Sequence, residues 1–197
     1  MPEQRKASQN RETAETKIFA ELNIDGSGDS NVDTGIPFLD HMLTLFARHS
    51  LCDLNISAEG DIEVDYHHTV EDVGIVLGSC FKEALGDKCG ISRYGWALLP
   101  MDETLSRVAI DFGGRPYIAY KAPEKVDSIR EFSFSLVEEF LRAFANNASA
   151  NIHVEVLYGR DAHHMAESIF KGLAKAIDLA ARLDPRVTGV PSTKKTL

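Results

Sequence analysis

The sequence predicts an α+β fold made of two similar two-layer halves, about residues 1–90 and 91–197, each a mixed β-sheet with helices on one face. The first observation is a repeated pattern, His-His-x-x-Glu, at residues 67–71 and again at 163–167. The second is that a strand-like segment precedes each copy and a long helix-like segment follows it. The third is that 197 residues with 44% hydrophobic content can bury a real core. We therefore expect one duplicated domain.

The charge balance and the cysteines restrict the possible partners of this chain. With 30 acidic and 21 basic residues the net charge is −9, which argues against a nucleic-acid partner and against an anionic membrane surface. An anionic small molecule would have to be bound by a few placed cations. The three cysteines show no Cys-x-x-Cys spacing, the first ten residues are polar, and no apolar run approaches membrane-spanning length. We expect a cytoplasmic protein with reduced thiols.

Strands and two helices are expected in the first half. Alternation of polar and apolar residues predicts a strand over 11–24, and Asp-Gly-Ser-Gly-Asp at 25–29 supplies a turn. Apolar residues at helical spacing predict a helix over 38–49. Two short strands are expected at 53–58 and 61–65. The second runs directly into the first His-His-x-x-Glu, whose helix should continue to about Gly86.

The second half repeats this order of elements. Strand-like residues occupy 106–112, and the Gly-Gly-Arg-Pro sequence at 113–116 turns the chain. An amphipathic pattern predicts a helix over 128–145, and we assign its apolar stripe to the core. Residues 151–158 are expected to form a strand and 159–162 a loop. The second motif then opens a helix that should run to about Arg182.

If each motif begins a helix, its two histidines flank one carboxylate. At about 100° per residue, His67 and Glu71 lie within about 40° of each other, and His68 and Glu71 within about 60° on the other side. Adjacent histidines diverge by about 100°, so we expect each motif to contribute to two different metal sites. A single copy is better explained by exposed or capped histidines than by a metal site, but the duplication favours metal.

The remaining histidines extend this pattern. His153 lies in the strand just before the second copy, and His41 lies near the start of the 38–49 helix. For His49, a place at the core edge is as consistent as contact with a substrate. Imidazole and carboxylate together suit a borderline divalent ion such as manganese, iron or zinc, and no cysteine nearby suggests a soft thiolate site.

Several polar residues have two interpretations. Arg93 and Arg115 lie beside glycine or proline in expected loops, where a guanidinium can bind phosphate bidentately or simply face solvent. Lys171 could point toward a site or into water. The basic tail at 191–195 is either a flexible terminus or a phosphate-binding segment. From spacing alone, Glu15 is an ordinary outward-facing strand carboxylate.

A resemblance to a known family rests on eight segments that match in order and span nearly the whole chain. The segments are Arg11-x-Thr13-x-Glu15-Thr16, Phe38-Leu39-Asp40-His41-Met42-Leu43, Gly60-Asp61 with His67-His68-Thr69-Val70-Glu71-Asp72, Arg93-Tyr94-Gly95, Pro100-Met101-Asp102-Glu103, Gly114-Arg115-Pro116, His163-His164-x-x-Glu167 with Phe170-Lys171, and Pro191-Ser192-Thr193-Lys194. Together they resemble the imidazoleglycerol-phosphate dehydratases of histidine biosynthesis. The chain departs from the family pattern, without replacing an expected ligand, at Ser50, Tyr66, Asp161, Ser168 and Lys195. Lys195 leaves open which of the two tail lysines binds.

The resemblance implies a fold, an activity and a set of site residues. The fold is the duplicated α+β class called ribosomal protein S5 domain 2-like, in a single catalytic domain over residues 1–197. The activity is that of a lyase: metal-dependent dehydration of D-erythro-imidazole-glycerol phosphate to imidazole acetol phosphate and water. It implies two Mn²⁺ ions per active site, with ligands drawn from His41, His67, His68, Glu71, His153, His163, His164 and Glu167. It implies a phosphate pocket formed by Arg93, Arg115, Lys171, Ser192 and Lys194.

The resemblance also implies an assembly and a chemical route. The family forms trimers packed into a 24-subunit shell, with active sites between subunits. Because the substrate has no carbonyl beside the C–H bond that breaks, two Lewis-acidic ions on the imidazole ring would have to activate it. A base must then take the C–H proton. Our hypothesis makes Glu15, in contact with the substrate, the leading proton-transfer residue, with Glu167 or a metal-bound water as alternatives.

Other protein classes fit the sequence less well. A dinuclear metal-dependent phosphoester hydrolase would share the His/Glu ligands, and it is the main alternative. A ferritin-like protein would place Glu-x-x-His on four long helices, whereas here the order is His-x-x-Glu and strands precede each motif. A nucleic-acid-binding module is opposed by the acidic charge.

Overall fold

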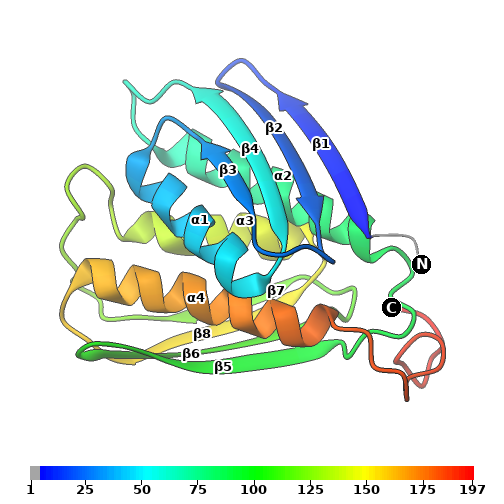
Figure 1. Cartoon of the computed structure of the whole chain (residues 1–197). Coiled ribbons are helices and arrows are strands. Elements are labelled where there is room, and N and C mark those ends of the chain that lie inside the picture. Colours follow the sequence, from blue (N-terminus) through cyan, green and yellow to red (C-terminus); the bar gives the residue numbers. More distant parts are fainter. Residues whose placement is uncertain (1–4) are drawn as a thin grey trace.

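In the described part of the chain, two four-stranded sheets enclose four helices, which lie between the sheets as two layers (Figure 1). The structure is a computed structural model and describes residues 5–197. Of the polar N-terminal stretch, residues 1–4 lie outside the described part, and residues 6–10 belong to the first strand. The start of the first strand and the C-terminal end of the chain lie on the same side of the molecule (Figure 1).

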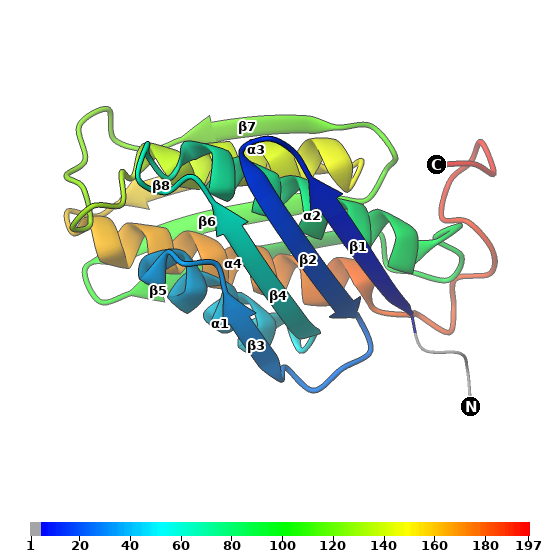
Figure 2. The same ribbon diagram turned by 90° about the horizontal axis from the view of Figure 1, so that it is seen from above.

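The first half forms the upper sheet in Figure 1 and the two helices beneath it. Its strand order is β1-β2-β4-β3, with β3 and β4 parallel and the other pairs antiparallel, as Figure 2 shows from above. The elements are β1 (Lys6–Glu12), β2 (Thr16–Asn23), β3 (Ser30–Asp33), α1 (Pro37–Ser50), β4 (Asp53–Gly60) and α2 (His67–Leu85).

The second half repeats the same topology. Its strand order is β5-β6-β8-β7, again with one parallel pair, β7 with β8. The elements are β5 (Tyr94–Met101), β6 (Thr104–Asp111), β7 (Tyr117–Lys121), α3 (Ser135–Asn147), β8 (Asn151–Tyr158) and α4 (Ala162–Ala181). The predicted α+β class and its duplication, with a mixed sheet and helices on one face of each, are confirmed.

Several predicted elements are also confirmed, including the helices that begin at the two motifs and the strand at 151–158. The strand predicted over 61–65 is wrong: Val64 donates its backbone N–H to the carbonyl of Asp61 at 2.8 Å, which closes a turn. The segment 11–24 is a hairpin rather than one strand, because Thr13 donates to the carbonyl of Thr16 at 2.9 Å and the chain reverses there. The helix predicted over 128–145 begins only at Ser135.

Contact between the two helix layers joins the halves into one core. Gly74 and Gly78 of α2 face α3 closely enough that an added Cβ would lie 2.8 Å from the Phe140 carbonyl oxygen and 2.6 Å from that of Phe144. Aromatic rings continue the contact, with Phe81 and Phe144 centroids 5.4 Å apart. The halves therefore do not have separate hydrophobic cores.

The outer faces of the two sheets differ in character. In the second sheet, β5 exposes Trp96 and Leu98 to 67% and 62%, and Tyr117 of β7 and Tyr158 of β8 are also exposed. Among the described residues, no large hydrophobic side chain of β1 to β4 is exposed in this way. An exposed apolar sheet face of this kind is typical of a protein interface. Within residues 5–197, none of the helices is both long and apolar enough to cross a bilayer.

Candidate metal centre

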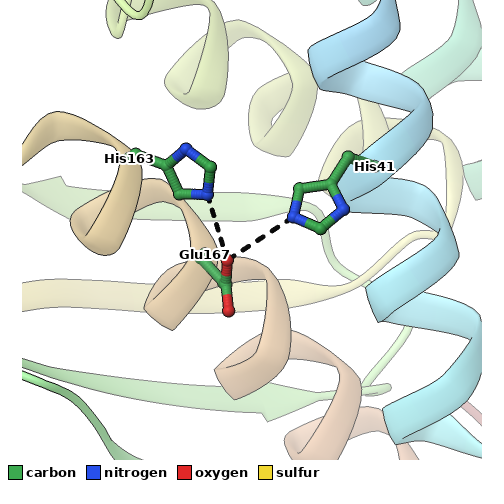
Figure 3. A group of neighbouring side chains, drawn as sticks. All are labelled: His41, His163 and Glu167. Carbon is green, nitrogen blue, oxygen red and sulfur yellow. Dashed lines mark hydrogen bonds and ion pairs between the residues drawn. The ribbon is translucent and has the colours of Figure 1, made fainter.

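Three of the predicted metal ligands come together between α1 and α4 (Figure 3). Nε2 of His163 lies 3.2 Å from Oε2 of Glu167, and Nε2 of His41 lies 3.6 Å from the same oxygen. The potential ligand atoms of all three residues are within 4.8 Å of one another. Glu167 is buried while both imidazoles keep solvent access. Two imidazoles and one carboxylate are a donor set that fits a borderline divalent ion such as manganese, iron or zinc.

Local structure explains how these three side chains meet. His163 and Glu167 lie one helical turn apart on the same face of α4. The N-terminus of α4 is fixed by Asp161, whose side chain accepts a hydrogen bond from the backbone N–H of His164 at 3.1 Å. The ring of Phe38, near the start of α1, packs edge-on against His163 with centroids 5.2 Å apart, which brings His41 alongside.

The electrostatic surroundings keep Glu167 ionised. Burial alone would raise the pKa of this carboxyl group, but Lys171 and His163 outweigh it and hold the pKa below its usual value. The ammonium of Lys171 lies 2.5 Å from Oε1 of Glu167, on the opposite oxygen from His163. Lys171 is therefore paired with the metal-ligand group and is not simply solvated.

The second histidine of each motif is held by a carboxylate. Nδ1 of His68 lies 3.0 Å from Oδ2 of Asp61, and Nδ1 of His164 lies 2.7 Å from Oε2 of Glu103. The hydrogen bond to Asp61 raises the pKa of His68, and the bond to Glu103 raises that of His164. Adjacent rings diverge in both motifs, with centroids 6.0 and 6.2 Å apart and nearly perpendicular planes.

The other predicted ligands lie apart from this group within a single chain. His67 and Glu71 lie in the first turns of α2, and in the described part of the chain they join no three-ligand cluster. His153 lies in β8 on the outer face of the second sheet, beside Tyr117, with ring centroids 5.9 Å apart. Within the described residues of one chain, these predicted ligands therefore do not complete a second three-ligand group.

Glu15 lies in the turn between β1 and β2, next to the first motif. Its Oε1 is 3.8 Å from Nε2 of His68, and its side chain is more than half exposed. The backbone carbonyl of Glu15 accepts a hydrogen bond from the N–H of Asp61 at 3.1 Å, which fixes the hairpin turn against the start of the motif. Glu15 is therefore an accessible carboxylate beside the first motif.

Four of the five predicted phosphate-binding residues line one pocket at the other end of α4: Arg93, Arg115, Ser192 and Lys194. Arg93 donates its backbone N–H to the carbonyl of Ala180, near the C-terminus of α4. At 1.5 Å per residue, the helix separates this pocket from His163 by about 25 Å. Lys171, the fifth residue, lies with Glu167 instead.

Three carboxylates were not anticipated as site residues. Asp61 and Glu103 hold the second histidines, and Asp111 accepts two hydrogen bonds from Arg93. Asp61 and Glu103 lie in segments that carry the family resemblance, which is the only sequence signal for them. No spacing rule connects Glu103 to His164, because the contact forms only when the β5–β6 hairpin packs beside α4.

The match to a family model and the matches to curated proteins agree with each other. The family model described as imidazoleglycerol-phosphate dehydratase matches residues 34–177. The dehydratase of Akkermansia muciniphila is 60% identical over 195 residues, covering 98% of this chain and all of that protein. The dehydratase of Geobacter metallireducens is 56% identical over 193 residues, covering 98% of this chain and 99% of its own length.

Solved structures of the same kind share the fold. The crystal structure of imidazoleglycerol-phosphate dehydratase from Staphylococcus aureus superimposes with a TM-score of 0.83 at 38% identity, over 91% of this chain and 99% of that one. The structure from Pyrococcus furiosus gives a TM-score of 0.83 at 36% identity, over 96% and 100% of the two chains.

Proposed function

The chain belongs to the imidazoleglycerol-phosphate dehydratase family, and from this premise we propose which role each of its site residues has in the reaction. The protein is a metal-dependent hydro-lyase that dehydrates imidazoleglycerol phosphate to imidazole acetol phosphate in histidine biosynthesis. The matches name a dehydratase throughout, so the phosphoester hydrolase alternative has no support.

The group of His41, His163 and Glu167 is the observation that carries the metal assignment. We assign Mn²⁺ to the enzyme, with two ions per active site. The remaining ligands would come from His67, His68, Glu71, His153 and His164, because each of these side chains carries an imidazole or a carboxylate. When bound, the ions supply Lewis acidity to the imidazole ring of the substrate.

Glu15 is the residue we assign to proton transfer. The C–H bond that breaks has no adjacent carbonyl, so a positioned base must accept its proton. Glu15 has an accessible carboxylate at the first motif, and the hydrogen bond from Asp61 to its carbonyl fixes its backbone. Glu167 is the alternative, although its pairing with Lys171 and His163 favours a ligand role.

The pocket lined by Arg93, Arg115, Ser192 and Lys194 is the phosphate anchor in this proposal. Guanidinium groups bind phosphate oxygens bidentately, and a tail hydroxyl and ammonium add further donors. Anchoring the phosphate would orient the glycerol side chain and use binding energy for positioning. Lys171 would act near the metal and Glu167 rather than in this pocket.

The distance between metal group and phosphate pocket supports a site shared between copies. About 25 Å of helix separates them, which is much longer than a substrate made of one ring, a glycerol side chain and a phosphate. His153 lies on the apolar outer face of the second sheet, where another copy could cover it. We propose that trimers, packed into a 24-subunit shell, bring the groups together. We also propose that the halves 1–90 and 91–197 form one catalytic domain and that the enzyme works in the cytoplasm.

Metal removal tests this proposal directly. Protein stripped with a chelator should not turn over imidazoleglycerol phosphate, and Mn²⁺ should restore turnover when about two ions bind per subunit. Metal content is recorded on the same sample. Binding of two ions without turnover would contradict the assigned roles of the residues, and full turnover without metal would contradict the metal centre.

A further inference from the structure

Both motifs place a carboxylate on the same nitrogen of the same histidine. Asp61 approaches Nδ1 of His68 with both oxygens, at 3.0 and 3.2 Å, and Glu103 approaches Nδ1 of His164 at 2.7 Å. The two carboxylates come from different places: Asp61 follows β4, whereas Glu103 lies in the turn between β5 and β6. The two halves therefore place a carboxylate on this nitrogen from different positions in the fold. The duplication alone does not explain the shared arrangement.

An ionised carboxylate can only accept hydrogen bonds, so Nδ1 of each ring must carry a proton. In the neutral imidazole, the lone pair is then on Nε2. Nε2 of His68 faces Glu15, and Nε2 of His164 faces Asp102 at 3.7 Å, so both point away from the orienting carboxylate. The carboxylates therefore choose which nitrogen of each ring is free to bind a metal.

Both carboxylates are themselves fixed. Oε1 of Glu103 accepts the backbone N–H groups of Asp161 and Arg160 at 3.0 and 3.3 Å, just before α4. The backbone N–H of Asp61 donates to the carbonyl of Glu15 at 3.1 Å. Their side chains are only about one-quarter exposed. A carboxylate held in this way restricts the rotation of the imidazole that it contacts.

We propose that Asp61 and Glu103 are positioning residues that hold His68 and His164 in the tautomer and orientation needed for metal binding through Nε2. This inference rests on the proposed function, because it takes the two histidines as metal ligands. A carboxylate on the far nitrogen also increases the basicity of the ligand nitrogen. Loss of either carboxylate should therefore weaken metal binding without removing a ligand.

The chain offers matched controls at the same two helix starts. Asp65 accepts the backbone N–H of His67 at 2.7 Å, and Asp161 accepts that of His164 at 3.1 Å, but neither bonds to a ring nitrogen. The variants Asp65→Asn and Asp161→Asn remove the same charge as Asp61→Asn and Glu103→Gln. An amide can donate to Nδ1 as well as accept from it, so it no longer determines the tautomer.

The experiment measures Mn²⁺ affinity of the chelator-stripped full chain, by the electron paramagnetic resonance signal of free Mn²⁺ during titration. We expect Asp61→Asn and Glu103→Gln each to weaken binding about 10–100-fold. The controls should change it by less than about fivefold, the range of an exposed charge pair. Thermal unfolding of the same metal-free samples identifies any variant that does not fold.

Other results of this titration would distinguish failure of the positioning role from failure of the proposed function. Equal weakening in the variants and their controls would overturn the positioning role, because loss of charge alone would explain it. Wild-type affinity in Asp61→Asn and Glu103→Gln would overturn that role alone and leave the proposed function intact. A wild-type chain that binds no Mn²⁺ would overturn both. If an amide variant does not fold, Asp61→Glu and Glu103→Asp keep the carboxylate and should retain binding within about tenfold.

Discussion

The guanidinium of Arg93 donates two hydrogen bonds to the carboxylate of Asp111, from Nε to Oδ1 at 2.7 Å and from Nη2 to Oδ2 at 3.0 Å. Its remaining Nη1 donates to the carbonyl oxygen of Pro191 at 2.9 Å. Arg93 therefore connects the end of β6 to the C-terminal tail. Because Ser192 and Lys194 lie one and three residues after Pro191, Asp111 helps through Arg93 to hold the tail beside the pocket proposed to bind phosphate.

Replacing Asp111 should affect substrate binding more than chemistry. An amide in Asp111→Asn cannot accept both guanidinium hydrogen bonds, so Arg93 and the tail lose their fixed positions. We expect KM for imidazoleglycerol phosphate to rise about tenfold, a free-energy loss of about 1.4 kcal/mol, with kcat nearly unchanged. Steady-state kinetics measure both. The control Asp184→Asn breaks an exposed pair with Arg186 and should leave KM unchanged; an unchanged KM in Asp111→Asn would refute the role.

Glu15→Gln should lose turnover while keeping its metal. A glutamine has the same shape but cannot accept the substrate proton, and we expect kcat to fall about 10²–10⁴-fold. Metal content should match the wild type, because Glu15 is not among the proposed ligands. Glu12→Gln, an exposed carboxylate at the end of β1, is the control and should remain active. Full turnover by Glu15→Gln with normal metal content would show that another group moves the proton.

A charge on the apolar face of the second sheet should prevent assembly. Leu98 is 62% exposed on β5, and Leu98→Glu would place a charged carboxylate in the proposed interface. We expect sedimentation to shift to smaller species and activity to fall with it, because the proposed active site is shared between copies. Ser57→Glu, on the outer face of the first sheet, adds the same charge and should assemble normally. An active monomer of Leu98→Glu would contradict a site shared between copies.

Gly78 should be required for the close packing of α2 on α3. A Cβ at this position would lie 2.6 Å from the backbone carbonyl oxygen of Phe144, which cannot move without displacing its helix. We expect Gly78→Ala to lower the free energy of unfolding by about 1–3 kcal/mol, despite the better helix propensity of alanine. Urea denaturation measures the change. Lys82→Ala, on the exposed side of α2, should stay within about 0.5 kcal/mol of the wild type.

Lys88 should make the protein more stable as the pH rises into the alkaline range. Burial lowers the pKa of its ammonium, which donates to the carbonyl oxygen of Phe112 at 3.0 Å. Below the native-state pKa both states hold the proton, and burial of the charge carries its full cost. Between that pKa and 10.5, the native state releases the proton while the unfolded chain keeps it, so the free energy of unfolding increases with pH.

Lys88→Met should lack this increase, and urea denaturation at several pH values below 10.5 measures it. The exposed Lys17→Met variant should keep the wild-type pH dependence, which separates the effect of Lys88 from a general effect of alkaline pH. Parallel pH profiles for the wild type and Lys88→Met would show that the buried amine does not change its charge on folding.

The predicted elements that proved right carry local signals. The helices α2 and α4 follow from apolar periodicity, and β8 follows from its alternation between Asn151 and Tyr158. The missed strands β3 and β7 are edge strands of four and five residues, held by parallel pairing with β4 and β8. Their pairing partners are distant in sequence, so local patterns do not reveal them. Ile62 and Val64 alternate like a strand, but their segment has no partner strand in the described chain and turns instead.

The contacts of the candidate site could also be predicted only in part from the sequence. The contact between His163 and Glu167 follows from helical spacing alone, whereas His41 reaches them only because α1 packs on α4. The roles of Asp61, Glu103 and Asp111 depend on hairpins and strand ends that meet in three dimensions. The residue types therefore predict which side chains could bind a metal. They do not predict which carboxylates orient those side chains.

The origin of the metal-ligand group in both halves has a consequence for synthesis of the protein. His41 leaves the ribosome when more than half of the chain is still untranslated, whereas His163 and Glu167 emerge near the end. The three-ligand group therefore cannot exist on a nascent chain, and its ion must be acquired after translation is nearly complete.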